Sequence, residues 1–251
     1  MTRVGSLHGH PKRGSLPRDR LARSANGAAL TIVVPVLNES MQIVACLREL
    51  ATLRARGAQV IVADGGSTDA TAEWARPLAD QVLQCPRGRA RQMNFGAAQA
   101  RGQTLLFLHA DTRLPAGALA AIDTALTNPS AHWGRFDVRI EGRPRLLKLV
   151  AWMMNLRSRL SGIATGDQAI FVRRDSFLRV GGFPDQPLME DIELSKRLRR
   201  LARPVCLRQR VATSGRRWER DGVWRTIALM WRLRWLYWTG TPPERLAELY
   251  K

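Results

Sequence analysis

The chain has 251 residues, a length that fits a single α/β domain with additions. Its apolar content of 45% is ordinary for a globular protein, but 40 Lys and Arg residues stand against 21 Asp and Glu residues, a formal net charge of +19. This excess predicts an anionic partner, either nucleic acid, an anionic membrane surface or a phosphorylated substrate, unless it reflects only a solvated surface encoded with an arginine-rich bias.

The cysteines and the apolar runs exclude several classes of protein. Cys46, Cys85 and Cys206 are far apart and form no Cys-x-x-Cys, so neither a zinc site nor a disulfide framework is expected, and a reducing cytosol is predicted. No stretch reaches about 18 consecutive apolar residues, and the basic amino terminus lacks the apolar segment of a secretory signal. We therefore expect a cytoplasmic protein, with peripheral attachment to the cytoplasmic face of the membrane as a further option.

Alternating strands and helices are predicted for the first half of the chain. Residues 1–28 are rich in Arg, Gly, Ser and Pro and predict a disordered basic tail. The uninterrupted apolar run Thr31-Ile32-Val33-Val34-Pro35 then predicts a strand buried on both faces, as in a parallel sheet. Further strands are expected at 59–63, 81–83 and 104–109, with helices at about 39–53, 69–75 and 88–100. This order predicts an α/β fold, a doubly wound and mostly parallel sheet with helices on both faces.

The second half predicts an antiparallel extension of that sheet. Phe136, Val138 and Ile140 alternate with polar residues over 135–141, which indicates an antiparallel strand with one face in water. Another strand is expected at 168–172, and helices at about 115–127, 146–160, 190–201 and 223–238. Residues 29–215 are predicted to form the main domain, and 216–251 a helical extension rich in Trp and Arg.

The last of these helices has an aromatic face. Arg225, Arg232 and Arg234 lie beside a set of apolar residues on one helical face: Trp224, Ile227, Ala228, Trp231, Trp235 and Trp238. This pattern predicts a membrane-interface helix, which the apolar helix 146–160 could join. Packing of the tryptophans against the sheet is an equally weighted alternative.

Polar clusters follow the first two predicted strands. They are Pro35-Val36-Leu37-Asn38-Glu39 and Asp64-Gly65-Gly66-Ser67-Thr68-Asp69. Because ligands of open α/β sheets bind at the carboxyl ends of strands, these clusters could hold a nucleoside. Turns and helix caps are the alternative, most of all for Ser67 to Asp69.

Arginines near two helix starts could meet a diphosphate. Arg89 and Arg91 occupy the first turn of the helix at 88–100, where guanidinium groups and free N–H groups suit phosphate oxygens. Arg216-Arg217-Trp218 could clamp a leaving diphosphate. A solvated basic surface explains either group equally simply.

Two acidic positions predict the chemistry. Asp111 ends an apolar run and could bind Mg²⁺ or Mn²⁺ that bridges phosphates, although a helix cap is the alternative. His109 is read as a strand-end residue rather than a metal ligand. Asp191 would take the proton of an acceptor hydroxyl, and Glu190 competes for that role because both precede a helix.

These pieces, in this order, resemble family 2 glycosyltransferases from Thr31 to Arg200. The carrying residues are Ile32 to Glu39, Asp64 to Asp69, His109-Ala110-Asp111, Gly166-Asp167-Gln168 and Glu190-Asp191. The resemblance implies a GT-A fold and an inverting transfer from a nucleotide-diphosphate sugar, with Mg²⁺ or Mn²⁺.

Site residues follow from the same resemblance. Pro35, Leu37, Glu39 and Asp64 would hold the nucleoside, and Arg91 would lie near the nucleotide. Asp111 would be the metal-side aspartate, and Asp191 the base with Glu190 beside it. The acceptor side would comprise Gly166, Asp167, Gln168, Arg217 and Trp218.

The chain departs from the family pattern at three places. Leu37 replaces an aromatic residue, and His109 replaces the first aspartate of the Asp-x-Asp motif, which puts metal affinity in doubt. Arg216-Arg217-Trp218 lacks the full Gln-x-x-Arg-Trp motif of processive members. Residues 107–115 and 187–191 look like a bacterial subgroup associated with radical-SAM or arsenosugar gene neighbourhoods, some of whose members are named as carotenoid-acid glycosyltransferases.

The predicted function is therefore transfer of a sugar to a hydroxyl or carboxyl of a small or lipid-like acceptor, such as a carotenoid acid or an arsenosugar precursor. Two alternatives remain open. A basic nucleic-acid-binding protein would explain the charge but not the carboxylates at strand ends. A nucleotidyltransferase would need a glycine-rich basic segment after the first strand, where Val36-Leu37-Asn38-Glu39 stands.

Overall fold

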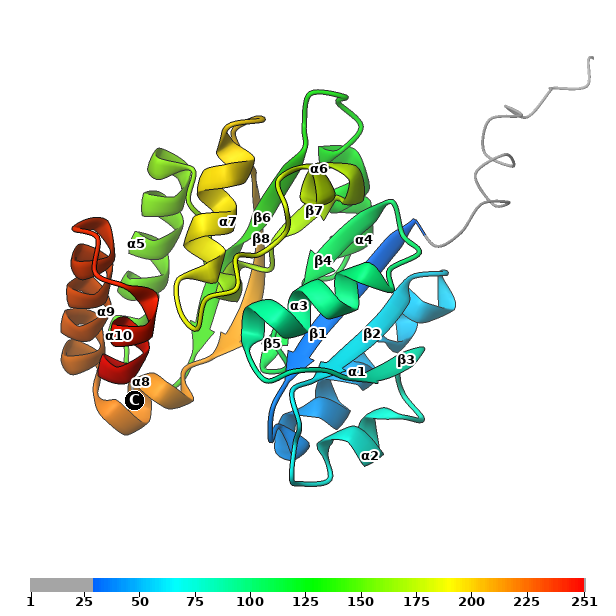
Figure 1. Ribbon diagram of the computed structural model, residues 1–251, viewed down its shortest axis with the longest axis horizontal. Helices are drawn as coiled ribbons and strands as arrows, with labels where there is room; N and C mark the ends of the chain where they lie inside the picture. Colours follow the sequence, from blue (N-terminus) through cyan, green and yellow to red (C-terminus); the bar gives the residue numbers. More distant parts are fainter. Residues whose placement is uncertain (1–28, 251) are drawn as a thin grey trace, which may run out of the picture.

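The computed structural model describes residues 29–250, which form one eight-stranded sheet surrounded by helices (Figure 1). The predicted tail, residues 1–28, lies outside the described residues. Along the sheet the strands follow the order β3-β2-β1-β4-β7-β6-β8-β5. The predicted α/β fold with a doubly wound, mostly parallel sheet is confirmed.

The first half of the sheet is parallel. Its strands are β1 (Leu30–Val36), β2 (Gln59–Asp64), β3 (Gln81–Gln84) and β4 (Thr104–Phe107). β1 pairs with β2 and with β4, β2 also pairs with β3, and all three pairings are parallel. The crossovers contain α1 (Ser40–Ala55), α2 (Thr71–Ala75) and α3 (Arg89–Ala98). β1 and β2 are almost fully buried, as their uninterrupted apolar runs predict.

The second half contains antiparallel pairings. Its strands are β5 (Thr112–Arg113), β6 (Trp133–Glu141), β7 (Phe171–Arg173) and β8 (Val205–Ser214). β7 pairs antiparallel with both β4 and β6, and β5 pairs antiparallel with β8. The antiparallel extension is therefore present next to β4.

The prediction for β6 was wrong in two respects. β6 pairs antiparallel with β7 only at Trp133 and Gly134, and runs parallel to β8 along its length. The face of β6 that was expected to lie in water is also buried as far as Val138. The polar side chains there satisfy one another: Arg135 donates to Asp137, which also accepts from Arg159 at 2.6 Å. Burial is possible because α5 (Leu146–Ser161) packs across the strand.

The remaining helices come after β5 in the chain. They are α4 (Ala118–Ala125), α6 (Arg174–Arg179), α7 (Glu190–Arg199), α8 (Arg216–Asp221), α9 (Val223–Trp238) and α10 (Pro243–Leu249). The predicted strand at 168–172 is shorter than expected. Gly166–Gln168 forms a 3-10 turn, η3, because Thr165 and Gln168 make a capping box there.

α9 and α10 lie at the end of the molecule opposite β3 (Figure 1). They follow β8 and α8 in the chain, and the predicted boundary at residue 215 stays a prediction. Leu233 of α9 and Leu246 of α10 pack with Met189 and Ile192, which attaches the extension to the start of α7. Within residues 29–250, no helix is both long enough and apolar enough to cross a membrane.

The aromatic face of α9 points outward. Trp224, Trp231, Trp235 and Trp238 are 61–76% exposed, whereas Leu233 on the opposite side is fully buried. α5 exposes a second apolar stripe, which consists of Leu149, Trp152, Met153, Leu156 and Leu160. The tryptophans therefore do not pack against the sheet.

Candidate active site

The loops after β1 and β2 are joined by hydrogen bonds. The backbone N–H of Asn38 donates to Ser67 Oγ at 2.9 Å, and Asn38 Oδ1 accepts from the Thr68 amide at 2.8 Å. The Glu39 amide donates to Thr71 Oγ1 at 2.8 Å. Asn38 adopts a left-handed conformation (φ 54°), which this short side chain tolerates. The two predicted nucleoside-binding segments therefore form one cross-linked unit.

Asp64 ends β2 and is buried within this unit. Its Oδ1 accepts from the amide and the hydroxyl of Ser67, at 3.0 and 2.6 Å. Its Oδ2 is buried and has no hydrogen-bond partner among residues 29–250. Buried acceptors are nearly always paired, so an unpaired carboxylate oxygen at a strand end indicates that a ligand supplies the missing donor. Pro35 and Leu37 lie partly buried on the neighbouring strand end.

Gln92 is a positioning residue that the sequence did not reveal. From α3 its Nε2 donates to the carbonyls of Val36 and Ala63, at 2.6 and 2.9 Å. It thereby ties the ends of β1 and β2 together. Gly65 must be glycine here, because a Cβ would lie 2.9 Å from Gln92 Cδ. A glutamine among other polar helix residues carries no sequence signal for such a role.

Ser67 to Asp69 act as turn and cap residues. Asp69 accepts from the amide and hydroxyl of Thr71 and from the Ser40 amide. The hydrogen bond from the Thr71 hydroxyl, followed by that from Ser40, lowers the pKa of Asp69 to about 2. The contacts of Ser67 to Asp69 are therefore those of turn and helix-cap residues, the alternative to nucleoside binding.

Arg216 lies between two carboxylates at the sheet edge. Its Nη2 is 3.9 Å from Glu39 Oε2 and 3.8 Å from Asp111 Oδ2. Burial and the charge of Asp111 raise the pKa of Glu39, while Arg216 opposes the shift. The structure thus brings Glu39 and Asp111 together, and Arg216 rather than Arg217 reaches them.

Asp111 fits a metal ion only as one ligand among several. Within residues 29–250, no group of three His, Cys, Asp or Glu side chains is arranged to hold a metal ion. Mg²⁺, however, is usually bound by one or two carboxylates together with substrate phosphates and waters. Asp111 suits that arrangement, with Glu39 close by. A diphosphate would have to supply further ligands.

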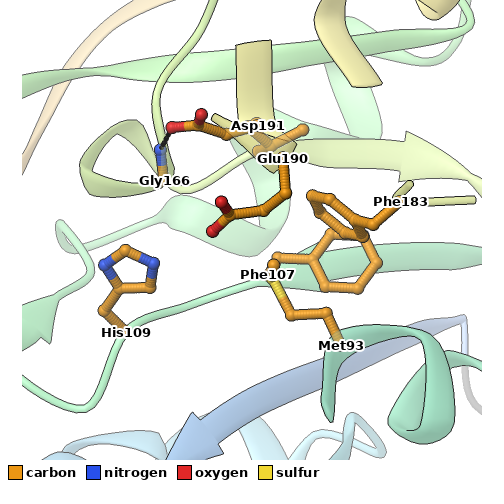
Figure 2. A pocket seen from close by; sticks show the side chains of 8 residues that line it. Met93, Phe107, His109, Gly166, Phe183, Glu190 and Asp191 are labelled. Carbon is orange, nitrogen blue, oxygen red and sulfur yellow. Dashed lines mark hydrogen bonds between the residues drawn. The ribbon is translucent and has the colours of Figure 1, made fainter. Parts of the chain in front are cut away.

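A small pocket lies beside this edge (Figure 2). Its apolar wall consists of Met93, Phe107, Ile170 and Phe183, and its polar side of His109, Gly166, Glu190 and Asp191. The His109 ring packs against Gly166, where a Cβ would lie 2.5 Å from Cε1. His109 Nδ1 is 3.5 Å from Asp167 Oδ1. His109 therefore belongs to the pocket through Gly166 and Asp167.

Asp191 and Glu190 differ in their surroundings. Asp191 Oδ2 accepts from the Gly166 amide at 2.8 Å, and Oδ1 accepts from the Ile192 amide at 2.7 Å. Glu190 points into the pocket toward His109 in Figure 2 and is only 4% exposed. Burial and the charge of Asp191 raise the pKa of Glu190, and Arg89 opposes this at 3.7 Å. Two backbone amides therefore hold the carboxylate of Asp191 in a fixed orientation.

Glu190→Gln is expected to stabilise the protein at neutral pH. A carboxyl group whose pKa is raised on folding contributes stability below its unfolded pKa and loses it as the pH rises through the folded value. At pH 8 the variant avoids the free-energy cost of burying an ionised carboxylate. We therefore expect its Tm to be higher by about 2–4 °C, the shift that about 1 kcal/mol gives in a domain of this size. The difference in Tm between the variant and the wild type should disappear at pH 4. Calorimetry at pH 8 and pH 4 measures this difference in Tm. An equal difference at the two pH values would contradict the raised pKa of Glu190.

The two arginines of α3 face different partners. Arg89 approaches Glu190, whereas Arg91 is exposed and its Nε lies 2.7 Å from Asp185 Oδ1. The hydrogen bond and charge of Asp185 raise the pKa of Arg91. Contact of Arg91 with a nucleotide would require that ion pair to open, and its predicted role stays a prediction.

The predicted acceptor-side residues divide into two groups. Gly166, Asp167 and Gln168 form η3 beside Asp191, and Gln168 is buried, with Nε2 at 3.3 Å from Asn155 Oδ1. Arg217 instead stacks on the Tyr250 ring at 3.7 Å and donates to the Tyr250 carbonyl at 3.1 Å. Trp218 packs against the main core. These last two residues attach the extension and lie outside the pocket.

Comparisons with known proteins identify the family. The family model for glycosyl transferase family 2 matches residues 31–176. No curated protein sequence matches the chain. A mannosyltransferase structure from Pyrobaculum calidifontis has a TM-score of 0.57 and 22% identity, over 75% of this chain and 57% of that one.

Two further structures show the same fold. TarS (residues 1–349) from S. aureus has a TM-score of 0.60 at 20% identity, over 74% of this chain and 58% of that one. Glucosyl-3-phosphoglycerate synthase from Mycobacterium tuberculosis has a TM-score of 0.56 at 18% identity, over 82% and 77%. The chain thus spans less than two thirds of the mannosyltransferase and of TarS. The family match covers more than half of the chain and agrees with the GT-A fold of these neighbours, and the chain therefore belongs to glycosyl transferase family 2.

Proposed function

We propose that the chain is an inverting glycosyltransferase that moves a sugar from a nucleotide-diphosphate sugar to an acceptor hydroxyl or carboxyl. One observation carries the proposal: acidic side chains from four separate segments line one edge of the sheet. Asp64 is tied through Ser67 to the loop that holds Glu39. Arg216 joins Glu39 to Asp111, and the pocket beside them contains Glu190 and Asp191.

The donor side is assigned to the first half of the sheet. Asp64 would accept from the nucleoside through its unpaired Oδ2, with Pro35, Leu37 and Glu39 beside it and Arg91 near the nucleotide. Arg216 would meet the diphosphate. A divalent cation held by Asp111 would neutralise charge on the leaving diphosphate.

The acceptor side is assigned to η3 and the start of α7. The acceptor oxygen attacks the anomeric carbon, the bond from that carbon to the diphosphate breaks, and the nucleoside diphosphate leaves with the electron pair. Asp191 accepts the acceptor's proton, and two backbone amides hold its carboxylate beside η3. The amide bond from Gly166 also fixes its orientation.

The solved neighbours support this class of donor. The Pyrobaculum mannosyltransferase structure contains GDP-Man and Mn²⁺, and one TarS structure contains UDP-GlcNAc. The mycobacterial synthase structure contains Mn²⁺, UDP and glucosyl-3-phosphoglycerate. These ligands define the first panel of compounds to test here.

A ligand panel tests the proposed function. We expect one nucleotide-diphosphate sugar at about 100 times its Kd to raise the unfolding free energy by about 2.7 kcal/mol, or roughly 5–10 °C in Tm. Mn²⁺ should increase this shift, and EDTA should reverse the increase. Differential scanning fluorimetry of sugar nucleotides with and without Mn²⁺ measures both effects. A chain stabilised only by short oligonucleotides would be the nucleic-acid-binding protein that we weighed as an alternative.

We further propose that α5 and α9 dock on an anionic membrane surface. Both helices expose apolar stripes, and Arg225 and Arg232 beside the α9 tryptophans are exposed cations. Interface helices combine these two features, since tryptophans enter the headgroup region while arginines meet lipid phosphates. A lipid-like acceptor, such as a carotenoid acid, would be presented at that surface. Arsenosugar precursors remain water-soluble candidates.

Liposome binding tests this docking surface. We expect the protein to co-sediment with anionic vesicles, and the pair Trp235→Ser and Trp238→Ser to weaken binding at least about tenfold, since each buried large side chain contributes about 1.5–3 kcal/mol. Trp74→Ser is the matched control, because Trp74 is an exposed tryptophan on α2, away from both helices. Equal binding by the double variant and the wild type would exclude this face.

A further inference from the structure

Two arginines on helices far apart in the sequence, Arg157 and Arg234, lie near enough to Asp191 to interact with its charge. Arg157 belongs to α5, which Asn155 joins to η3 through its contact with Gln168. Arg234 belongs to α9, where it follows the buried Leu233.

Leu233 fixes the position of α9. It packs against Met189 and Ile192, the residues on either side of Glu190 and Asp191. η3 supplies the Gly166 amide that binds Asp191. α5 and α9 thus each contribute one arginine, Arg157 and Arg234, that interacts electrostatically with Asp191.

Neither guanidinium is bonded within residues 29–250. Arg157 Nη2 is buried and has no hydrogen-bond partner. Arg234 is partly buried and makes no hydrogen bond or ion pair with the described residues. Arg135 shows the contrast: it is fully buried nearby and donates to Ser158, Asp137 and the Asn155 carbonyl. Buried donors are normally satisfied, so an unbonded pair indicates a missing ligand.

The local charges agree with this geometry. Burial lowers the pKa of Arg157 to about 10, the charge of Arg234 adds to the shift, and Asp191 opposes it. Burial also lowers the pKa of Arg234, and Asp191 and Asp167 oppose the shift. Asp167, however, interacts with His109, and Asp191 is bonded to two amides. The nearby carboxylates therefore leave the two guanidinium groups without direct partners.

We propose that Arg157 and Arg234 bind a phosphate monoester group of the acceptor and so direct the acceptor's reacting oxygen to Asp191. The inference rests on the proposed function and names its acceptor class. A phosphate monoester carries about −1.5 to −2 charges at neutral pH, which matches two guanidinium groups better than a single carboxylate does. Its oxygens also suit the forked donors of arginine.

A soluble phosphorylated metabolite and a lipid with a phosphate monoester headgroup present the same group. The lipid source would connect this subsite to the outer faces of the same helices. α5 and α9 carry exposed apolar stripes on the sides away from the core. The experiment therefore has one arm for each source.

In the soluble arm, glycerol phosphate is titrated calorimetrically into protein saturated with Mn²⁺ and the nucleoside diphosphate selected in the ligand panel. The saturating nucleotide fills the donor site, so that the phosphate probe reports on another site. Glycerol and glycerate serve as neutral and carboxylate controls. We expect glycerol phosphate to bind more tightly than glycerate, and glycerol to show no binding.

The variants assign that binding to the two arginines. Arg157→Gln and Arg234→Gln should each weaken it about tenfold, and together about 100-fold, as expected for charge-assisted hydrogen bonds. The pair Arg157→Lys and Arg234→Lys should retain part of the affinity, because the charges remain. Arg48→Gln, an exposed arginine on α1, is the control of equal charge change and should bind like the wild type.

In the lipid arm, vesicles that contain phosphatidic acid are compared with vesicles that contain phosphatidylglycerol, a phosphodiester. A lipid acceptor predicts a preference of about tenfold for phosphatidic acid, lost in the double Gln variant. A soluble acceptor predicts glycerol phosphate binding without that preference.

Three results would overturn the proposal. The first is a wild-type protein that neither binds glycerol phosphate nor prefers phosphatidic acid. The second is a double Gln variant that binds either probe like the wild type. The third is a loss of nucleoside diphosphate affinity in the Lys and Gln variants alike, which would place the arginines on the donor side. A wild-type protein that binds the nucleoside diphosphate but neither glycerol phosphate nor phosphatidic acid would refute this subsite and leave the proposed function standing.

Discussion

Asp191→Asn is expected to lower kcat by about 10²–10⁴-fold and to leave the affinity for the sugar nucleotide unchanged. An amide cannot accept the acceptor's proton, while its carbonyl oxygen can still accept from the Gly166 amide and only the bond from the Ile192 amide is lost. Single-turnover assays at saturating donor measure the chemical step, and a donor titration measures binding.

Glu190→Gln decides between the two adjacent carboxylates. It removes the neighbouring acid but leaves the amide bonds of Asp191 in place. If Asp191 is the base, Glu190→Gln should retain more activity than Asp191→Asn. Glu73→Gln, an exposed carboxylate on α2, controls for loss of one negative charge. Near-normal turnover of Asp191→Asn with an inactive Glu190→Gln variant would transfer the base assignment to Glu190.

Asp64→Asn is expected to weaken donor binding by about 10–150-fold, the range that follows from about 1.5–3 kcal/mol for a hydrogen bond to a charged group. The substitution keeps an oxygen for the two bonds from Ser67 but replaces the unpaired Oδ2 with a donor, which would oppose a nucleoside N–H or hydroxyl. Calorimetric titration with the preferred sugar nucleotide measures the loss.

Asp69→Asn is the matched control for Asp64. It makes the same chemical change in the same loop, but all the hydrogen bonds of Asp69 go to Thr71 and Ser40. We expect a lower Tm above pH 4, since the lowered pKa of Asp69 contributes stability above its unfolded value and loses it as the pH falls through the folded one. Donor affinity should not change. Equal losses of affinity in both variants would reduce Asp64 to a loop-stabilising role.

The centre of the parallel half of the sheet could be predicted because β1 and β2 are buried on both faces. β1 and β2 have no alternation to confuse the pattern, and polar residues mark their ends. β6 could not be read in the same way. Its alternation comes from Arg135 and Asp137, which neutralise each other in the interior beneath α5. A sequence shows polar residues but not the partners that permit their burial.

The candidate site likewise contains residues that the sequence could identify and residues that it could not. Asp64, Asp111 and Asp191 stand directly after apolar runs or at a helix start, so their positions along the chain indicate their roles. Gln92 and Arg157 carry no such mark, since their significance depends on contacts with residues distant in the sequence. Arg157 offered only a weak signal, since it is one of three charged residues in the mostly apolar α5, with Lys148 and Arg159.

The cross-linked loops after β1 and β2 have a consequence for how this chain can change. Asn38, Ser67, Thr71 and Gln92 hold the donor half together with contacts that involve only the first hundred residues. The acceptor half is assembled from α5, α7 and α9. Exchange of α9 and α10 for those of a homologue, with Arg216 of α8 kept, should therefore redirect the chain to another acceptor without rebuilding nucleotide recognition.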